Sequence, residues 1–420
     1  MTTTRDFRRV FKALVMNPLT PDGVEFYDPG YLIVAGEKIE RLSREDPRGE
    51  FPSAGFVDLG PKVILPGLVD THVHLPQFAI MGMGAGELLE WLNTYTYPEE
   101  ARFADPEYAA KISEMFFEEM LANGTTAAAV YSSTHEQAAD IAFATARAKG
   151  LRTFIGKVLM DQNSPATLQE TTAEAIAASL RLFEKWDGAD GGRLRYIFTP
   201  RYAASCSMDL MKKVGRIARE RGAFVQSHLS ENRAEVEWVT DLFPDCASYT
   251  SVYDSAGLLG RQSIMAHCIH LSSEEMALLA SRNTKVAFCP YSNRNLRSGT
   301  MPYHALRRAG LDIALGTDVA GGPSLSMLRQ MGEAVTAAAI TPAEALYLAT
   351  LGGAAVLGLS DRIGHFDAGK DADFIVVQVH GDDNGDEKPE HILSQLCFHA
   401  GKENIAEVYL RGRRVYFRNP

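Results

Sequence analysis

The sequence predicts an α/β protein: a TIM-like (β/α)8 barrel with a small β-sandwich domain formed from both chain ends. Three observations support this prediction. An apolar, strand-like run followed by a helical pattern recurs eight times between residues 66 and 321, which is typical of a parallel barrel. Short strand-like runs separated by turns occupy both ends of the chain. Residues suited to metal binding stand at the ends of several barrel strands, and one rim of a barrel collects such ends.

The two chain ends resemble each other. Near the N-terminus, FRRVFKALVM and YLIVAGEKIERLS are apolar runs separated by turns. Near the C-terminus, DADFIVVQV and AEVYLRGRRVYF have the same length and turn chemistry. We therefore expect residues 1–65 and 367–420 to form one discontinuous β-sandwich domain, and residues 66–366 to form the catalytic barrel.

The barrel strands alternate with helical segments. The eight strands are expected at LPGLVDTHVH (65–74), TTAAAVY (125–131), RTFIGKV (152–158), LRYIFTP (194–200), FVQSHL (224–229), SIMAH (263–267), KVAFCP (285–290) and DIALGTD (312–318). Among the helices, residues 107–124 end at Asn123-Gly124, and residues 272–283 begin with Ser272 as cap and Glu275 three residues on. Right-handed crossovers place the C-terminal ends of all the strands on one rim.

Composition excludes several classes of function. The chain has 420 residues, of which 46% are hydrophobic and 23% charged, as in an ordinary soluble globular protein. A net charge of -11 argues against a nucleic-acid partner, which requires a basic surface. No secretory signal and no apolar run long enough to span a membrane are found. Five scattered cysteines without a CxxC pair indicate reduced thiols and a cytoplasmic location.

Five potential metal ligands fall at the ends of predicted strands. His72 and His74 end the first strand and project the same way, because residues two apart on a strand share a face. His228, His267 and Asp318 end the fifth, sixth and eighth strands. Each alone has a plain structural alternative, such as a core histidine or a helix cap. Together they predict a metal site, and four nitrogens with one carboxylate suit one Zn²⁺ per subunit, with Fe²⁺ a chemically reasonable substitute.

Glu231 follows His228 by three residues in SHLSEN. This offset carries it past the end of the strand, where its carboxyl can reach over the barrel mouth. A glutamate in the first turn of a helix is also common without any further role. Beside a metal site that activates water, we interpret Glu231 as the candidate proton shuttle.

Several motifs carry a family resemblance. PGLVDTHVH, the single His of SHLSEN, the His of MAH, GTD and GKDADFIVV resemble the amidohydrolase superfamily. The segments that resemble the guanine deaminases within it are HLPQ (74–77), LLEWLNTYTYPEE (88–100), GKVLMD (156–161), TPRY (199–202), SHLSENRAEVEWV (227–239), YTSVYD (249–254) and LGTDVAGG (315–322). The resemblance covers nearly the whole chain and implies hydrolytic deamination of guanine to xanthine and ammonia by a homodimer.

The resemblance also implies roles for the metal-site residues. It implies that His72, His74, His228 and Asp318 bind zinc. His267 would be either a further ligand or a hydrogen-bonding partner of the bound water. Asp318 and His267 would take part in catalysis, and His228 would also border the substrate.

The purine site is implied in the same way. Gln77, Arg201 and Tyr202 would hold the purine, and Glu231 would shuttle protons. The guanidinium of Arg201 offers a fork of donors suited to the O6 carbonyl of guanine, which adenine lacks. Apolar residues of LLEWLNTYTYPEE at helical spacing predict a helix that both packs and covers the pocket.

One departure and three alternatives remain. Relatives commonly carry His-Cys-Pro at the end of the seventh strand, where this chain has Phe288-Cys289-Pro290, which affects the expected substrate preference. The other activity weighed is an aminohydrolase of a pterin or triazine. A binuclear cyclic-amide hydrolase would need a bridging lysine on the fourth strand, whereas Lys157 belongs to the third. The alternative from a different class is a metal-free binding scaffold of the same fold.

Overall fold

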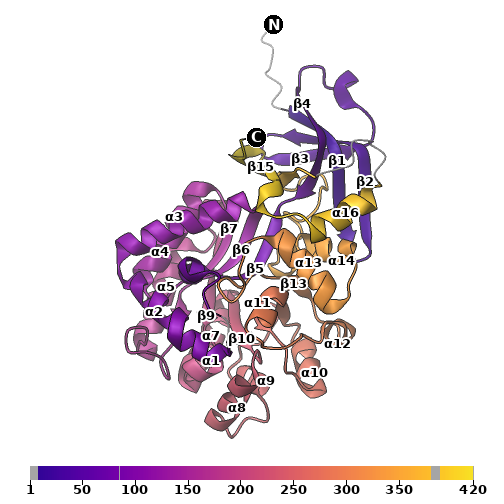
Figure 1. Ribbon diagram of the computed structural model, residues 1–420. Coiled ribbons are helices and arrows are strands. Elements are labelled where there is room, and N and C mark those ends of the chain that lie inside the picture. Colours follow the sequence, from indigo (N-terminus) through magenta and orange to yellow (C-terminus); the bar gives the residue numbers. More distant parts are fainter. Residues whose placement is uncertain (1–7, 85, 380–387, 420) are drawn as a thin grey trace. The chain divides into compact units, whose positions relative to one another are not determined.

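Figure 1 shows the computed structural model of the chain, which describes residues 8–84, 86–379 and 388–419. Parts of the predicted β-sandwich domain lie outside these ranges, namely residues 1–7, 380–387 and 420. The chain divides into two compact units. The first unit comprises Met1–Val69, Glu119–Ala127 and Ser326–Pro420, and the second comprises Asp70–Glu118 and Ala128–Leu325. The domain boundaries expected after residues 65 and 366 stay a prediction.

A nearly closed barrel of eight parallel strands confirms the predicted fold class. In order around the sheet, the strands are β5 (Leu68–His74), β6 (Thr125–Tyr131), β7 (Arg152–Gly156), β9 (Leu194–Pro200), β10 (Phe224–Leu229), β11 (Ser263–His267), β12 (Lys285–Phe288) and β13 (Ile313–Leu315). A short strand, β8 (Val158–Leu159), pairs with β9 outside this order. The last strand returns to the first, because the Asp318 amide donates to the His72 carbonyl at 2.8 Å.

Helices follow the barrel strands along the chain (Figure 1). They are α3 (Pro106–Ala122), α4 (Glu136–Lys149), α5 (Thr172–Trp186), α7 (Met208–Arg221), α8 (Arg233–Leu242), α9 (Tyr249–Ser255), α10 (Ser273–Ser281), α11 (Pro290–Asn295) and α12 (Tyr303–Arg308). Ser272 caps α10 as predicted: its side chain accepts from the Glu275 amide, and the Glu275 carboxylate accepts from the Ser272 amide. Helix α3 ends before Gly124, whose φ of 80° suits glycine.

The first unit contains a seven-stranded sheet built from both chain ends, as predicted. Its strands, in order, are β16 (Arg413–Phe417), β15 (Ile405–Leu410), β14 (Phe374–Val377), β4 (Gly55–Pro66), β1 (Arg8–Thr20), β2 (Gly23–Ala35) and β3 (Lys38–Ser43). The two ends meet where β14 pairs antiparallel with β4. Phe374 stacks on Tyr409 with ring centroids 4.4 Å apart, and Phe11 packs edge-on against both. These aromatic contacts tie the N-terminal and C-terminal strands into one core.

The described part of the first unit also contains α13 (Met327–Ala338), α14 (Pro342–Leu348), α15 (Leu351–Val356) and α16 (Pro389–Phe398). No helix in the described part of the chain is both long enough and apolar enough to cross a bilayer.

Candidate metal centre and substrate pocket

The end of β5 presents two histidines side by side. Every residue of this strand is buried. The Nε2 atoms of His72 and His74 lie 3.2 Å apart. Thr71 has the opposite orientation, since its Oγ1 donates to the Leu315 carbonyl at 2.8 Å. The alternation of side chains along a strand therefore produces the predicted pair.

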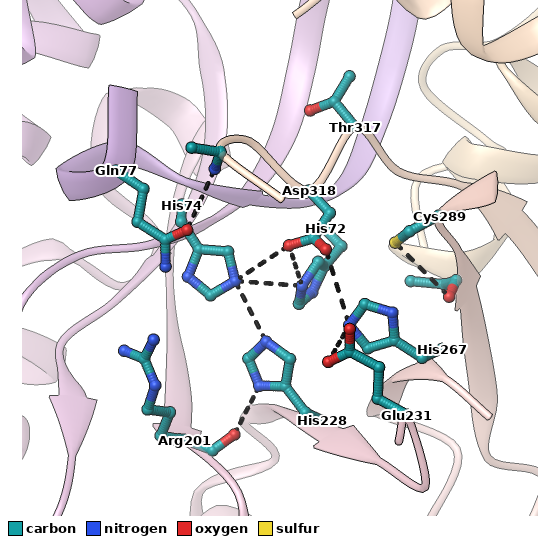
Figure 2. Close-up of polar contacts among 12 residues, drawn as sticks. His72, His74, Gln77, Arg201, His228, Glu231, His267, Cys289, Thr317 and Asp318 are labelled. Atoms are coloured by element: carbon teal, nitrogen blue, oxygen red, sulfur yellow. Dashed lines mark hydrogen bonds and ion pairs between the residues drawn. The ribbon is translucent and has the colours of Figure 1, made fainter. Parts of the chain in front are cut away.

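His228 and Asp318 complete a cluster of four with this pair (Figure 2). The His228 Nε2 lies 3.1 Å from the His74 Nε2. The Asp318 Oδ1 lies 3.2 Å from the His72 Nε2 and 3.3 Å from the His74 Nε2. The Nδ1 of His228 donates to the Arg201 carbonyl at 2.7 Å, since a carbonyl can only accept. A neutral His228 ring therefore carries its lone pair on Nε2, which faces the cluster.

The protonation states of this cluster fit a divalent metal ion. Burial lowers the pKa of His74 to about 4 and also lowers the pKa values of His72 and His228. Burial alone would raise the pKa of Asp318, but its close contacts with His72 and His74 hold that pKa well below its ordinary value. At neutral pH, three uncharged imidazoles thus surround one carboxylate, which is a suitable donor set for a metal. Lone pairs held this close repel one another unless a cation lies between them.

His267 lies beside the cluster at the end of β11. Ligand atoms of His72, His228, His267 and Asp318 all lie within 4.8 Å of one another. The His267 Nδ1 contacts the Asn293 Oδ1 at 2.9 Å, and its buried Nε2 has no hydrogen-bond partner among the described residues. The backbone turns sharply here, with φ of 70° at His267 and 49° at Asp318, and such strain is common at functional sites. This geometry is compatible with either role expected for His267.

Glu231 reaches the cluster from the segment after β10. Its Oε2 lies 3.4 Å from the His267 Nε2, and its Oε1 accepts from the Ser298 Oγ at 3.0 Å. Burial, and then repulsion from Asp318, raises the pKa of Glu231 to about 8. The Glu235 carboxylate accepts from the Glu231 backbone amide at 2.8 Å and so fixes this segment. A buried carboxyl that holds a proton near neutral pH is suited to general acid and base catalysis.

A pocket lies beside the cluster. It is lined by His74, Gln77, Leu88, Trp91, Leu92, Arg201, Tyr202, His228, Glu231, Glu235, His267, Leu296, Asp318 and Gly321. The three predicted purine contacts are all in this lining. One pocket lining therefore combines His74, His228 and Asp318 of the cluster with the predicted purine contacts.

The polar wall of the pocket is a buried hydrogen-bonded network. The Arg201 Nη1 donates to both carboxylate oxygens of Glu100, at 2.8 and 2.6 Å. The Gln77 Nε2 donates to the Glu100 Oε1 at 3.0 Å, and the Gln77 Oε1 accepts from the Ala320 amide at 3.1 Å. Burial alone would lower the pKa of Arg201. The attraction and the hydrogen bonds of the Glu100 carboxylate act in the opposite direction, and the pKa of Arg201 is raised overall. Tyr202 is 5% exposed and forms an aromatic part of the wall.

Comparison with known proteins agrees with this geometry. Residues 63–415 match the Amidohydrolase family. The chain belongs to the amidohydrolase family. It is similar to the guanine deaminase of Escherichia coli K12, with 36% identity over 94% of this chain and 93% of that protein. It is also similar to the guanine deaminase of Homo sapiens, with 37% identity over 84% of this chain and 82% of that protein.

Solved structures of other amidohydrolase-fold proteins resemble this one over nearly the whole chain. The E. coli guanine deaminase superposes with a TM-score of 0.94 at 33% identity, covering 98% of this chain and 100% of that one. A guanine deaminase from C. acetobutylicum, with guanine bound in its active site, superposes with a TM-score of 0.93 at 30% identity. That match covers 97% of this chain and 100% of the other.

Sequence analysis of this amidohydrolase missed Glu100. It stands at the end of LLEWLNTYTYPEE, which was interpreted for its apolar face alone. The predicted cover is present in part, since Leu88, Trp91 and Leu92 line the cavity. It is a continuous but irregular helical run: α1 (Leu88–Trp91) leads through a π-helical turn (Leu92–Thr96) into α2 (Tyr97–Ala101). The last glutamate of the motif is the available signal, but nothing local distinguishes it from a surface charge.

Two other residues weighed from the sequence lie away from this site. Lys157 follows β7 and its Nζ pairs with the Glu170 carboxylate. Phe288, the departure noted at the seventh strand, is buried in β12 and packs on Tyr303 with ring centroids 5.9 Å apart. Neither residue is part of the cavity lining of this amidohydrolase.

Proposed function

We propose that this amidohydrolase catalyses hydrolytic deamination of guanine to xanthine and ammonia, with one Zn²⁺ per subunit. The observation that carries the proposal is a single cavity that combines a metal-ligand cluster, a carboxyl with a pKa of about 8 and a buried guanidinium. Relatives of similar length that are guanine deaminases support this choice of substrate. The alternative of a metal-free scaffold is disfavoured, because all four residues of the cluster are in place.

We propose that His72, His74, His228 and Asp318 hold the metal. When bound, the metal supplies the Lewis acidity that allows water to react at neutral pH. His267 would either ligate it or donate a hydrogen bond to the attacking water.

Protein side chains would then transfer the protons. We propose that Asp318 accepts a proton from the water that attacks C2 of guanine, while the Glu231 carboxyl delivers its proton to N3. The tetrahedral carbon at C2 then collapses: the exocyclic amine takes the proton held by Asp318, the C2–N bond breaks and ammonia leaves, and the C2 hydroxyl returns its proton to Glu231 as the carbonyl forms. His267, whose Nε2 lies 3.4 Å from Glu231 and 3.8 Å from Asp318, is close enough to both carboxyls to orient them.

The purine would be oriented by the polar wall. Both contacts of Arg201 to Glu100 use Nη1, which leaves the donors on Nε and Nη2 for the O6 carbonyl of guanine. Gln77 would contact the ring edge, and Tyr202 would pack against the ring. Adenine offers no carbonyl to this fork, so it should be a poor substrate.

Loss of guanine absorbance with parallel ammonia release tests the proposal, with adenine, a pterin and melamine as challenge substrates. We expect turnover of guanine far above the others. Turnover of the pterin or of melamine but not guanine would reject the substrate, and no turnover at all by metal-loaded protein would favour the scaffold alternative. Elemental analysis distinguishes zinc from iron. We also propose a cytoplasmic homodimer: the described cysteines are all free, and analytical ultracentrifugation tests the dimer.

A further inference from the structure

We propose that Glu100 is a positioning residue that sets substrate specificity. It orients the side chains of Arg201 and Gln77, and it neutralises the guanidinium so that the pocket selects an uncharged purine with a ring carbonyl over an anionic one. The proposal rests on the proposed function, since it concerns how the same pocket recognises the purine.

Arg201 and Gln77 both line the cavity, whereas Glu100 stands behind them and contacts both. The identity of the Gln77 amide atoms is fixed, because a carboxylate only accepts and the Ala320 amide only donates. One carboxylate therefore sets the direction of two side chains that have long, flexible stems. Without it, each could adopt other rotamers, and their donors would lose their alignment with a bound ring.

The side chains of Arg201 and Glu100 are 3% and 1% exposed, so water screens neither of them well. A lone buried guanidinium would attract any anion of suitable shape. With the Glu100 carboxylate on Nη1, the pair is neutral as a whole, yet Nε and Nη2 still donate. Such a wall binds a carbonyl but does not favour an oxo-purine anion.

This property matters for product release. Replacing the exocyclic amine of guanine by a carbonyl gives a more acidic ring, so xanthine forms an anion more readily than guanine does. A negative carboxylate behind the guanidinium disfavours that anion. Glu100 would thus help the pocket to distinguish substrate from product.

The test compares Glu100→Gln with Glu99→Gln. Glu99 is the matched control: it is the adjacent residue of α2, is also buried, and accepts from Arg102 at 2.9 Å rather than from pocket residues. For E100Q we expect a KM for guanine raised about tenfold or more with kcat changed much less, because the lost interaction orients rather than reacts. Inhibition by xanthine, measured above its first ionisation, should become at least about tenfold tighter, because the opposing charge is gone. E99Q should match the wild type in both.

Several outcomes decide between the explanations. Absence of guanine turnover in the wild type rejects the proposed function itself. Guanine turnover with unchanged KM and unchanged xanthine inhibition in folded, metal-loaded E100Q rejects the role of Glu100 alone. If E100Q does not fold, E100D is the variant to measure. Its side chain keeps the negative charge but is one methylene shorter, so the carboxylate lies farther from Arg201 and Gln77. E100D should raise KM while xanthine inhibition stays at the wild-type level, and a wild-type KM in E100D would overturn the orienting role.

Discussion

Replacing Glu231 by Gln tests the proposed proton transfer most directly. The amide has nearly the same shape as the carboxyl and can still accept the hydrogen bond from the Ser298 Oγ, now 3.0 Å from Oε1. It cannot deliver a proton. A pKa of about 8 leaves the wild-type carboxyl about 90% protonated at pH 7, so the wild type is ready to act as an acid and the variant is not.

The expected loss follows from this single missing step. General acid and base catalysis is worth about 10²- to 10⁴-fold, or roughly 3 to 5 kcal/mol of transition-state stabilisation. We therefore expect kcat to fall by that factor, with KM for guanine within about threefold of the wild type. Metal content should be unchanged, because Glu231 does not belong to the cluster of four.

The assay follows guanine absorbance and ammonia in metal-loaded protein. Glu237→Gln serves as control, since Glu237 is an exposed glutamate of α8, the helix that follows Glu231 in the chain. Near-normal turnover in E231Q would refute the assigned role. A fall in metal content that accounts for the whole loss of activity would assign Glu231 to the metal site instead.

Two further predictions concern the pocket and the metal. Replacing Arg201 by Ala should raise KM for guanine about 10- to 150-fold, the value of a hydrogen bond to a charged group, and should lower the melting temperature by leaving Glu100 buried and unpaired. The R201A/E100Q double variant should melt at a higher temperature than R201A, without recovering affinity for guanine. Equal melting temperatures of R201A and R201A/E100Q would contradict the buried ion pair. Because burial lowers the pKa of His74 to about 4, it is about 3% protonated at pH 5.5, whereas an ordinary imidazole is about 90% protonated. Metal should therefore be retained at pH 5.5 after dialysis, and its loss with a midpoint at or above pH 6.5 would contradict neutral ligands.

The barrel and the metal cluster were predictable because their signals are local. An apolar run identifies each strand, and the polar residue that ends it marks the rim. His72, His228 and Asp318 each stand at such an end, so barrel geometry alone brings them together. The order of the strands around the barrel follows their order in the sequence, and the prediction needed no long-range contact beyond closure.

The cover over the pocket was predictable only in outline. Apolar spacing in LLEWLNTYTYPEE indicates one helical face, and Leu88, Trp91 and Leu92 do line the cavity. The helical run is not regular, because Pro98 has no N–H to donate to the preceding turn. The chain accommodates it with a π-helical turn at Leu92–Thr96 just before α2.

The pairing of Glu100 with Arg201 in the polar wall could not be predicted, for a different physical reason. Glu100 and Arg201 are 101 residues apart, and neither periodicity nor spacing relates them. A glutamate near the end of a short helix is usually a solvated charge. What makes this one different is that both charges are buried, and a buried charge is tolerable only with its partner in place. Backbone geometry thus determines which side chains reach the proposed metal site. The proposed choice of ring depends instead on the pair of Glu100 and Arg201, and only the folded chain brings these two side chains together.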